Sequence, residues 1–253
     1  MKWPNEQSLI VQQYEDDGFT IATQFITPDQ VSDVQTQLDQ YTEHTVPTLP
    51  AMDVFYEDKD ARNQIRMLPR MHEHEAYFND LLTTGPFREI AEQLFGAEAV
   101  PRDAAYFNKL PQIGEATPPH QDGYYFHLNP CEALTLWLSL DDVDEQNACV
   151  RYVPGSHRQG MRSHGRTEVL GFSQGITDYG DEDRNQEVPA CVKPGDLIAH
   201  DAMTIHRTDA NRSHHSRRAL GFVYYSVRAQ IDEAARERYQ QRLAQELAAE
   251  GRI

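Results

Sequence analysis

The chain has 253 residues, of which 39% are hydrophobic and 9% aromatic, and its formal net charge at pH 7 is −17. This length is enough for one large domain, and the composition is that of a water-soluble globular protein. So negative a chain is not expected to have nucleic acid or an anionic membrane surface as its main partner. No stretch of the sequence is apolar over the length of a membrane span.

The chain has three cysteines, Cys131, Cys149 and Cys191. Their odd number and wide spacing, with no Cys-x-x-Cys pair, argue against a disulfide framework and against a zinc site. We expect them to be small buried apolar residues in a protein of a reducing compartment. The first residues contain no apolar run of the kind that begins a signal peptide, so a cytoplasmic location is expected.

Residues 1–99 are expected to form a helical flank. The patterns in this part predict helices over 5–17, 28–41 and 87–95, a strand over 19–23 and a loop over 43–70. The second helix has the clearest start, because Thr27 can cap it, Pro28 suits its first position and Gln30 completes a capping box.

After residue 100 the pattern changes to short apolar and aromatic runs separated by turn signals. The runs predict strands over 104–110, 133–140, 148–153, 196–200 and 219–227. Helices followed by many strands favour a mainly β fold with flanking helices, a barrel or double-sheet jelly roll over 100–230, and not an alternating βαβ fold. The acidic segment 178–187 is expected to be a loop and 231–253 a C-terminal helix, which makes the chain a single domain.

Three residues far apart in the sequence carry the candidate chemistry: His120, Asp122 and His206. Two histidines and one carboxylate are the donors of the facial triad that holds non-haem Fe(II) and leaves positions open for oxygen chemistry. A His-x-Asp match alone arises by chance and means little. Residues two apart on a strand point to the same side, so His120 and Asp122 are expected to reach one metal from a strand end.

An arginine follows the second histidine. Arginine suits bidentate pairing with a carboxylate, so Arg217 is a candidate clamp for a dicarboxylate cosubstrate. Arg218 is adjacent, and because side chains alternate along a strand only one of the two can face the pocket.

Several motifs around these residues carry a family resemblance. They are His120-Gln121-Asp122-Gly123-Tyr124-Tyr125, Trp137, Val153-Pro154-Gly155-Ser156-His157, Pro194-Gly195-Asp196 and Asn211-Arg212-Ser213. Together with His206 and Arg217 they resemble the phytanoyl-CoA dioxygenase family over about residues 100–227. The sequence departs from the family pattern at Ala148, where glycine is usual, and at His200-Asp201, where two histidines are common.

The resemblance implies a double-stranded β-helix of the cupin-like jelly-roll type, which binds Fe(II) and uses 2-oxoglutarate and O2. It implies His120, Asp122 and His206 as iron ligands, Arg217 and Thr208 as partners of 2-oxoglutarate, and Trp137 and Asn108 as lining of its pocket. Related halogenases lack a carboxylate at the position of Asp122, so the resemblance favours hydroxylation, with release of succinate and CO2.

The expected substrate is a free small-molecule metabolite. An acyl-CoA carries several phosphate charges, and this acidic chain shows no basic cluster near the candidate site. The exceptions are Arg207, Arg212, Arg217 and Arg218.

Two other functions stay open. One is a non-catalytic, cupin-like protein that binds a metal or small molecule. The other is a serine hydrolase, because Gly171-Phe172-Ser173-Gln174-Gly175 matches the Gly-x-Ser-x-Gly elbow, with Asp196 and His206 as partners of Ser173. The elbow needs a strong strand before it and a helix after it, and the sequence predicts neither.

Overall fold

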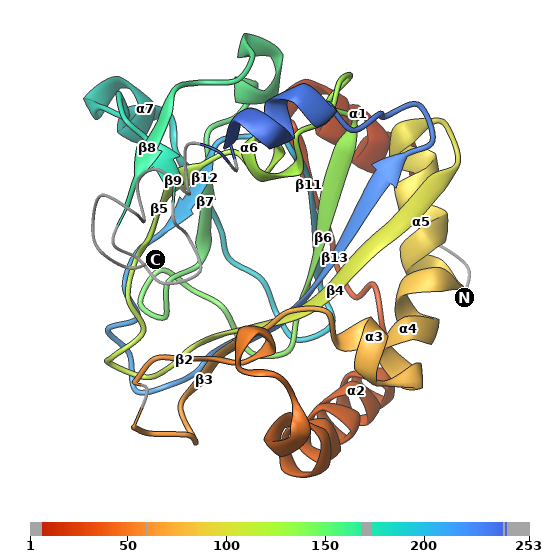
Figure 1. Cartoon of the computed structure of the whole chain (residues 1–253), viewed down its shortest axis with the longest axis vertical. Helices are drawn as coiled ribbons and strands as arrows, with labels where there is room; N and C mark the ends of the chain where they lie inside the picture. Colours follow the sequence, from red (N-terminus) through yellow and green to blue (C-terminus); the bar gives the residue numbers. More distant parts are fainter. Residues whose placement is uncertain (1–6, 59, 168–173, 240, 242–253) are drawn as a thin grey trace.

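Two antiparallel sheets that face each other form the centre of the molecule, as the computed structural model in Figure 1 shows. It describes residues 7–58, 60–167, 174–239 and 241. In order across the larger sheet lie β1 (Phe19–Ala22), β11 (Leu197–Asp201), β6 (Ala133–Ser139), β13 (Arg217–Ser226), β4 (Ala99–Lys109), β3 (Ile65–Leu68) and β2 (Phe55–Tyr56). The smaller sheet has the order β10 (Val188–Ala190), β7 (Val150–Tyr152), β12 (His206–Thr208) and β5 (Thr117–His120), and β8 (His164–Arg166) pairs with β9 (Gln174–Ile176).

Helices flank the larger sheet on its outer side (Figure 1). They are α1 (Gln7–Asp17), α2 (Pro28–Gln40), α3 (Met71–His74), α4 (Ala76–Thr83) and α5 (Pro86–Phe95), and the short helices α6 (Gly123–Phe126) and α7 (Asp181–Gln186) lie elsewhere. Single turns of π or 3-10 helix cover Tyr41–Thr45, Val46–Thr48, Ala51–Asp53 and Ser156–Gln159. The predicted jelly-roll fold with flanking helices is therefore confirmed.

Alternation along β6 explains how one strand serves both the core and the space between the sheets. All seven of its residues are buried. Leu134, Leu136 and Leu138 join the apolar cluster that the helices cover. Thr135 and Trp137 point the other way, toward the smaller sheet, because successive side chains of a strand face opposite sides.

The helix α2 begins as its sequence predicts. The Thr27 side chain accepts a hydrogen bond from the Gln30 backbone N–H, and the Gln30 side chain accepts one from the Thr27 backbone N–H. Pro28 takes the first position, where its missing N–H has no cost.

Other predicted elements were wrong in part. The segment 43–70, expected as a loop, contains β2 and β3, whose residues are half-buried except for Leu68 and lack the alternation that predicts a strand. The acidic segment 178–187 contains α7, whose acidic first turn suits a helix N-terminus. The last strand begins at Arg217 and not at residue 219.

The predicted C-terminal helix is described in part. Residues 233–239 are helical, and the rest of the predicted C-terminal helix lies outside the described residues.

Among the residues that the structure describes, no helix is both long and apolar enough to cross a membrane.

Candidate metal and cosubstrate site

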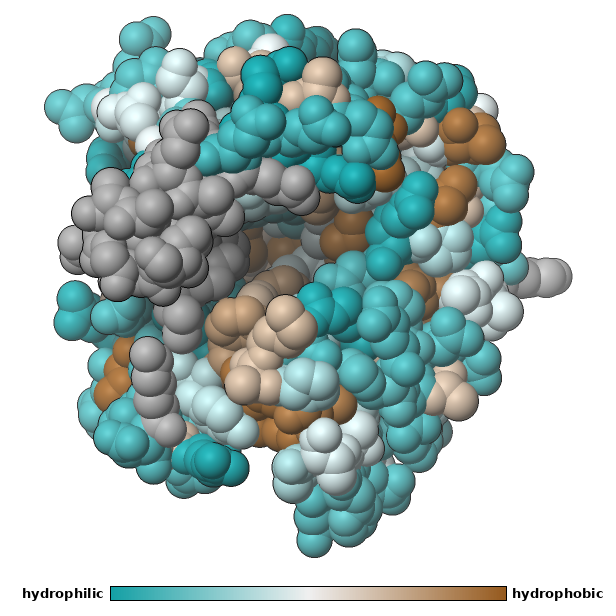
Figure 2. Space-filling view, viewed as in Figure 1, coloured by the Kyte–Doolittle hydropathy of each residue, from teal (hydrophilic) through white to brown (hydrophobic). Residues whose placement is uncertain are grey.

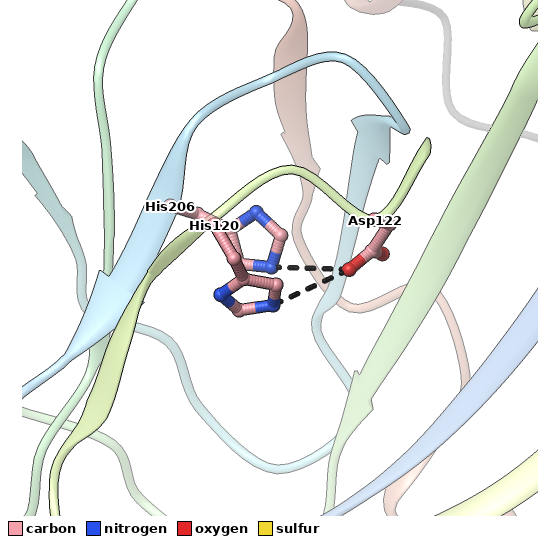
Figure 3. A group of neighbouring side chains, drawn as sticks. All are labelled: His120, Asp122 and His206. Atoms are coloured by element: carbon pink, nitrogen blue, oxygen red, sulfur yellow. Dashed lines mark ion pairs between the residues drawn. The ribbon is translucent and has the colours of Figure 1, made fainter. Parts of the chain in front are cut away.

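The two histidines of the candidate site face each other across neighbouring strands. His120 ends β5, His206 begins β12, and the two are direct partners in the antiparallel ladder. Figure 3 shows the Asp122 carboxylate turned toward both rings. Its Oδ1 lies 3.4 Å from His120 Nε2 and 3.6 Å from His206 Nε2. The three residues thus offer one ligand atom each within 4.8 Å of one another.

Asp122 reaches this point from a turn, which differs from the predicted strand end. The strand ends at His120, and Asp122 has helical dihedral angles (φ −57, ψ −35) as the residue before α6. The Gly123 N–H donates to the Ala202 carbonyl at 2.8 Å and fixes the turn. A Cβ at Gly123 would lie 2.6 Å from Cys131 Sγ, so this close approach requires glycine.

Backbone carbonyls orient both imidazoles. His120 Nδ1 lies 2.8 Å from the Pro118 oxygen, and His206 Nδ1 lies 3.0 Å from the Thr204 oxygen. A carbonyl can only accept, so each Nδ1 carries the proton and each Nε2 keeps its lone pair. This is the arrangement typical of metal-binding histidines.

A chain of hydrogen bonds holds the far oxygen of Asp122. Its Oδ2 accepts from Thr135 Oγ1 at 2.7 Å and from His200 Nε2 at 3.2 Å. The Tyr152 hydroxyl in turn donates to His200 Nδ1 at 3.0 Å. Both His200 nitrogens are therefore engaged, and although its ring lies 4.6 Å from that of His206, His200 offers no lone pair to a metal.

The charge states of the triad suit a cation. Burial raises the pKa of Asp122, but the surrounding imidazoles of His206, His120 and His200 outweigh it and hold this pKa well below its ordinary value. Burial, reinforced by His120, lowers the pKa of His206 well below its ordinary value. A carboxylate and a neutral imidazole are the forms that bind metal.

Arg217 lines the same cavity as the triad. It is only 5% exposed, and its Nη1 donates to the Ala148 carbonyl at 3.1 Å. Its Nε is buried without a hydrogen-bond partner in the structure, and its Cζ lies 5.1 Å from the Trp137 ring centroid. Burial lowers the pKa of Arg217 to about 10. Arg218 points to the other side of the strand, where its Nη2 pairs with Asp141 Oδ1 at 2.8 Å.

A cavity of about 90 Å³ joins these groups, and Figure 2 shows the molecular surface hollowed between the two sheets. It is lined by Phe107, Thr117, His120, Asp122, Thr135, Trp137, Val150, Tyr152, His200, His206, Arg207, Thr208 and Arg217. Thr208 Oγ1 accepts from the Thr117 N–H at 3.3 Å, which leaves its own O–H free to donate into the cavity.

Asn108 does not line this cavity. Because side chains alternate along β4, its neighbour Phe107 faces the triad instead. Asn108 lines an adjoining cavity of about 40 Å³, to which Arg217 and Lys109 also contribute. Its Nδ2 donates to the Ile65 carbonyl at 3.2 Å.

The sequence reasoning missed Thr135 and Tyr152 and noted His200 only as a departure from the family pattern. Their role comes from contacts between strands that are distant in the sequence. The strand register brings Thr135 opposite His200, and His206 opposite Tyr152. The alternation of β6, which puts Thr135 on the side of Trp137, was the one usable signal.

A larger cavity, about 530 Å³, lies beside α6 and contains none of the triad. Tyr124, Met161, Met203 and Tyr239 contribute to its wall. The two cavities share no lining residue, and of the neighbours Asp122 and Gly123 the first lines the triad cavity and the second lines the larger one. The smaller cavity, where the donor atoms converge, is therefore the candidate reaction site.

The hydrolase hypothesis finds no support in the described residues. Ser173 lies outside them. Asp196 accepts from the backbone N–H groups of Gln24 and Lys193, both at 2.7 Å. His206 directs its Nδ1 to a backbone carbonyl, so Asp196 is not its partner.

Comparisons with known proteins agree with the site. The sequence matches the phytanoyl-CoA dioxygenase (PhyH) family over residues 14–219. It is 28% identical over 156 residues to phytanoyl-CoA dioxygenase domain-containing protein 1 of Rattus norvegicus, covering 60% of this chain and 54% of that protein. It is 36% identical over 117 residues to phytanoyl-CoA dioxygenase 1 of Oryza sativa subsp. japonica, covering 46% and 41%. The chain spans about half the length of the curated relatives it matches.

Solved structures share the fold. The α-ketoglutarate-dependent carbocyclase SnoK from nogalamycin biosynthesis superposes with a TM-score of 0.71 at 23% identity, covering 88% of this chain and 85% of that chain. The epimerase SnoN, in complex with Fe3+, α-ketoglutarate and nogalamycin RO, gives 0.73 at 20%, covering 90% and 86%. EctD from S. alaskensis, with 2-oxoglutarate and 5-hydroxyectoine, gives 0.72 at 19%, covering 91% and 81%. With a family match over most of its length and this shared fold, the chain belongs to the phytanoyl-CoA dioxygenase family, as its motifs predicted.

Proposed function

We propose that this protein is an Fe(II)- and 2-oxoglutarate-dependent dioxygenase. One observation carries the proposal: two imidazole Nε2 atoms and a carboxylate oxygen converge in a cavity that also holds the buried Arg217. The SnoN structure contains Fe3+ and α-ketoglutarate, and the EctD structure contains 2-oxoglutarate, in proteins of the same fold.

The residues fit such a metal. His120, Asp122 and His206 would hold it, because they present two neutral nitrogens and one carboxylate from a single side. When bound, iron with 2-oxoglutarate and O2 supplies the oxidising chemistry. The backbone carbonyls behind both imidazoles and the donors behind Asp122 keep the three ligand atoms in place.

The cosubstrate would lie between the metal and Arg217. The guanidinium Nε, which lacks a protein partner, would pair with the distal carboxylate of 2-oxoglutarate, and the Thr208 O–H would donate to the same group. Trp137 and Val150 would exclude water from its carbon chain. Asn108 is assigned to the wall of the adjoining cavity.

The proposed reaction is hydroxylation of a free small-molecule metabolite, with release of succinate and CO2, in a cytoplasmic protein. The carboxylate of Asp122 occupies the position that halogenases leave open. An acyl-CoA would need unpaired cations for its phosphates. Arg207 is already engaged by Glu187 and by Asp209, each at 2.5 Å, and Arg218 is engaged by Asp141 at 2.8 Å. The ligands named with SnoN and EctD are small molecules without CoA.

The test is succinate release from 2-oxoglutarate by anaerobically purified protein reloaded with Fe(II). We expect slow release without substrate, a rise with some fraction of a metabolite pool, and loss in His206→Ala and Arg217→Ala. Arg218→Ala is the matched control and should retain the activity. Absence of both iron binding and succinate would favour a non-catalytic binding protein, and a hydroxylated product from phytanoyl-CoA would refute the free-metabolite substrate.

A further inference from the structure

Two of the three cysteines lie opposite each other at the edge of the smaller sheet. The strand β10 pairs antiparallel with β7, so that Ala190 is the partner of Val150. One position beyond this last pair of the ladder come Cys191 and Cys149, whose side chains are in hydrogen-bond contact. The expectation that all three cysteines are buried was wrong, because Cys191 is exposed and Cys131 is half-buried.

The backbone around the pair is compatible with a covalent link. The Cys149 N–H donates to the Asp144 carbonyl at 2.9 Å, so it is not bonded to Cys191. Directly opposed residues of antiparallel strands have Cα atoms roughly 4.5–5.5 Å apart, whichever type of pair they form. Disulfides span Cα separations of roughly 4.4–6.8 Å, so the strands need no rearrangement to accept one. Beyond the pair, Val143 and Val192 exchange two hydrogen bonds, at 2.8 and 3.1 Å, and hold the segments together.

We infer that Cys149 and Cys191 are a redox-active thiol pair, which an oxidant of the peroxide class converts into an intramolecular disulfide. Cys191 is exposed and meets the oxidant, whereas Cys149 is 1% exposed and resolves the product. This assignment is independent of the proposed function, because it concerns thiol chemistry outside the triad cavity.

The reaction balances in two steps. The Cys191 sulfur gives an electron pair to one peroxide oxygen, the O–O bond breaks, and a sulfenic acid and one water form. The Cys149 sulfur then attacks the Cys191 sulfur, the S–S bond forms, and the hydroxyl leaves with the Cys149 proton as a second water. Two thiols are oxidised and one peroxide is reduced.

The pair lies next to the candidate site. Ala148 precedes Cys149, has a left-handed φ of 72°, and its carbonyl accepts the hydrogen bond of Arg217. Val150 follows Cys149 and lines the triad cavity. The disulfide would therefore fasten the sheet edge at the residues that flank the arginine.

The experiment treats the reduced full chain with one equivalent of hydrogen peroxide, then unfolds it in iodoacetamide for intact-mass measurement and peptide mapping. We expect a link between Cys149 and Cys191, one alkylated thiol at Cys131, and full reversal by dithiothreitol. Three alkylated thiols, a link that includes Cys131, or disulfide-bonded dimers as the main product would overturn the inference.

Variants separate the roles of the three thiols. Cys131→Ser is the matched control and should form the link as the wild type does. Cys191→Ser should leave Cys149 reduced, and Cys149→Ser should leave a sulfenic acid at Cys191 that dimedone captures. If Cys149→Ser does not fold, the other two variants still decide, because oxidation of Cys149 in Cys191→Ser would contradict the assigned order.

Discussion

The adjacent residues Arg217 and Arg218 have different surroundings and different roles. They are chemically identical neighbours, yet one is buried in the triad cavity and the other forms an ion pair with Asp141. The sequence predicted that only one could face the pocket, and the strand β13 settles which one does.

The first prediction compares Arg217→Lys with Arg218→Lys. Lysine keeps the charge but cannot form two parallel hydrogen bonds to a carboxylate. Arg217→Lys should therefore raise the KM for 2-oxoglutarate at least about tenfold, as loss of a charged hydrogen bond worth roughly 1.5–3 kcal/mol implies. Arg218→Lys should leave it unchanged, and equal effects in succinate assays would contradict the assignment.

The second prediction concerns the residues that hold the far oxygen of Asp122. His200→Phe and Thr135→Val each remove one donor to Oδ2 and should weaken Fe(II) binding roughly 10- to 100-fold, because loss of such partners loosens a metal ligand. Thr135→Ser restores the hydroxyl and should restore affinity. Anaerobic metal titration measures this directly, and unchanged affinity in both donor-free variants would refute the role.

At the scale of elements, a helix or strand could be predicted from the sequence where the contacts that form it lie between residues close together in the chain. The start of α2 depends on four consecutive residues, so the sequence predicted it. The strands β5 and β12 have four and three residues, and Pro118-Pro119 lies within β5. Such short segments become strands because they pair with neighbouring strands, β12 with both β5 and β7, and no local pattern reveals that pairing.

The third prediction tests the α2 cap. Thr27→Ala removes the hydroxyl that accepts from Gln30 and should lower the free energy of unfolding by about 1 kcal/mol. Thr36→Ala on the same helix is the matched control, because the Thr36 hydroxyl donates to the Ser32 backbone carbonyl within the helix and caps no free N–H. Urea unfolding of both variants should show a clear loss for Thr27→Ala alone.

At the scale of the whole molecule, the candidate site lies between the two sheets. The smaller sheet gives His120 and His206, and the larger gives Arg217 and Thr135. Residue types predicted the triad, and the resemblance of its surrounding motifs predicted the family. The Tyr152–His200–Asp122 chain and the cysteine pair could not be predicted, because both depend on the register between strands far apart in sequence.

The fourth prediction concerns bound Fe(II) and 2-oxoglutarate, which would contact residues of both sheets. Fe(II) with 2-oxoglutarate should stabilise the folded protein by about 2.7 kcal/mol for a ligand at a hundred times its Kd. Chelation should reverse the rise in Tm. In His206→Ala the rise should be absent, and a similar rise in that variant would show that the ligands bind elsewhere.

His120 and His206 are direct partners across β5 and β12, so the chain returns to the metal site after a long intervening segment. Between Asp122 and His206 the chain builds α6, β6, β7, β8, β9, α7, β10 and β11, of which β6, β7 and β11 also supply residues to the triad cavity. Side-chain changes in α6 after Gly123, for example at Tyr124, would reshape the neighbouring cavity and leave the metal ligands in place. Substrate preference can therefore change while the metal ligands stay the same, because the two depend on different residues of the chain.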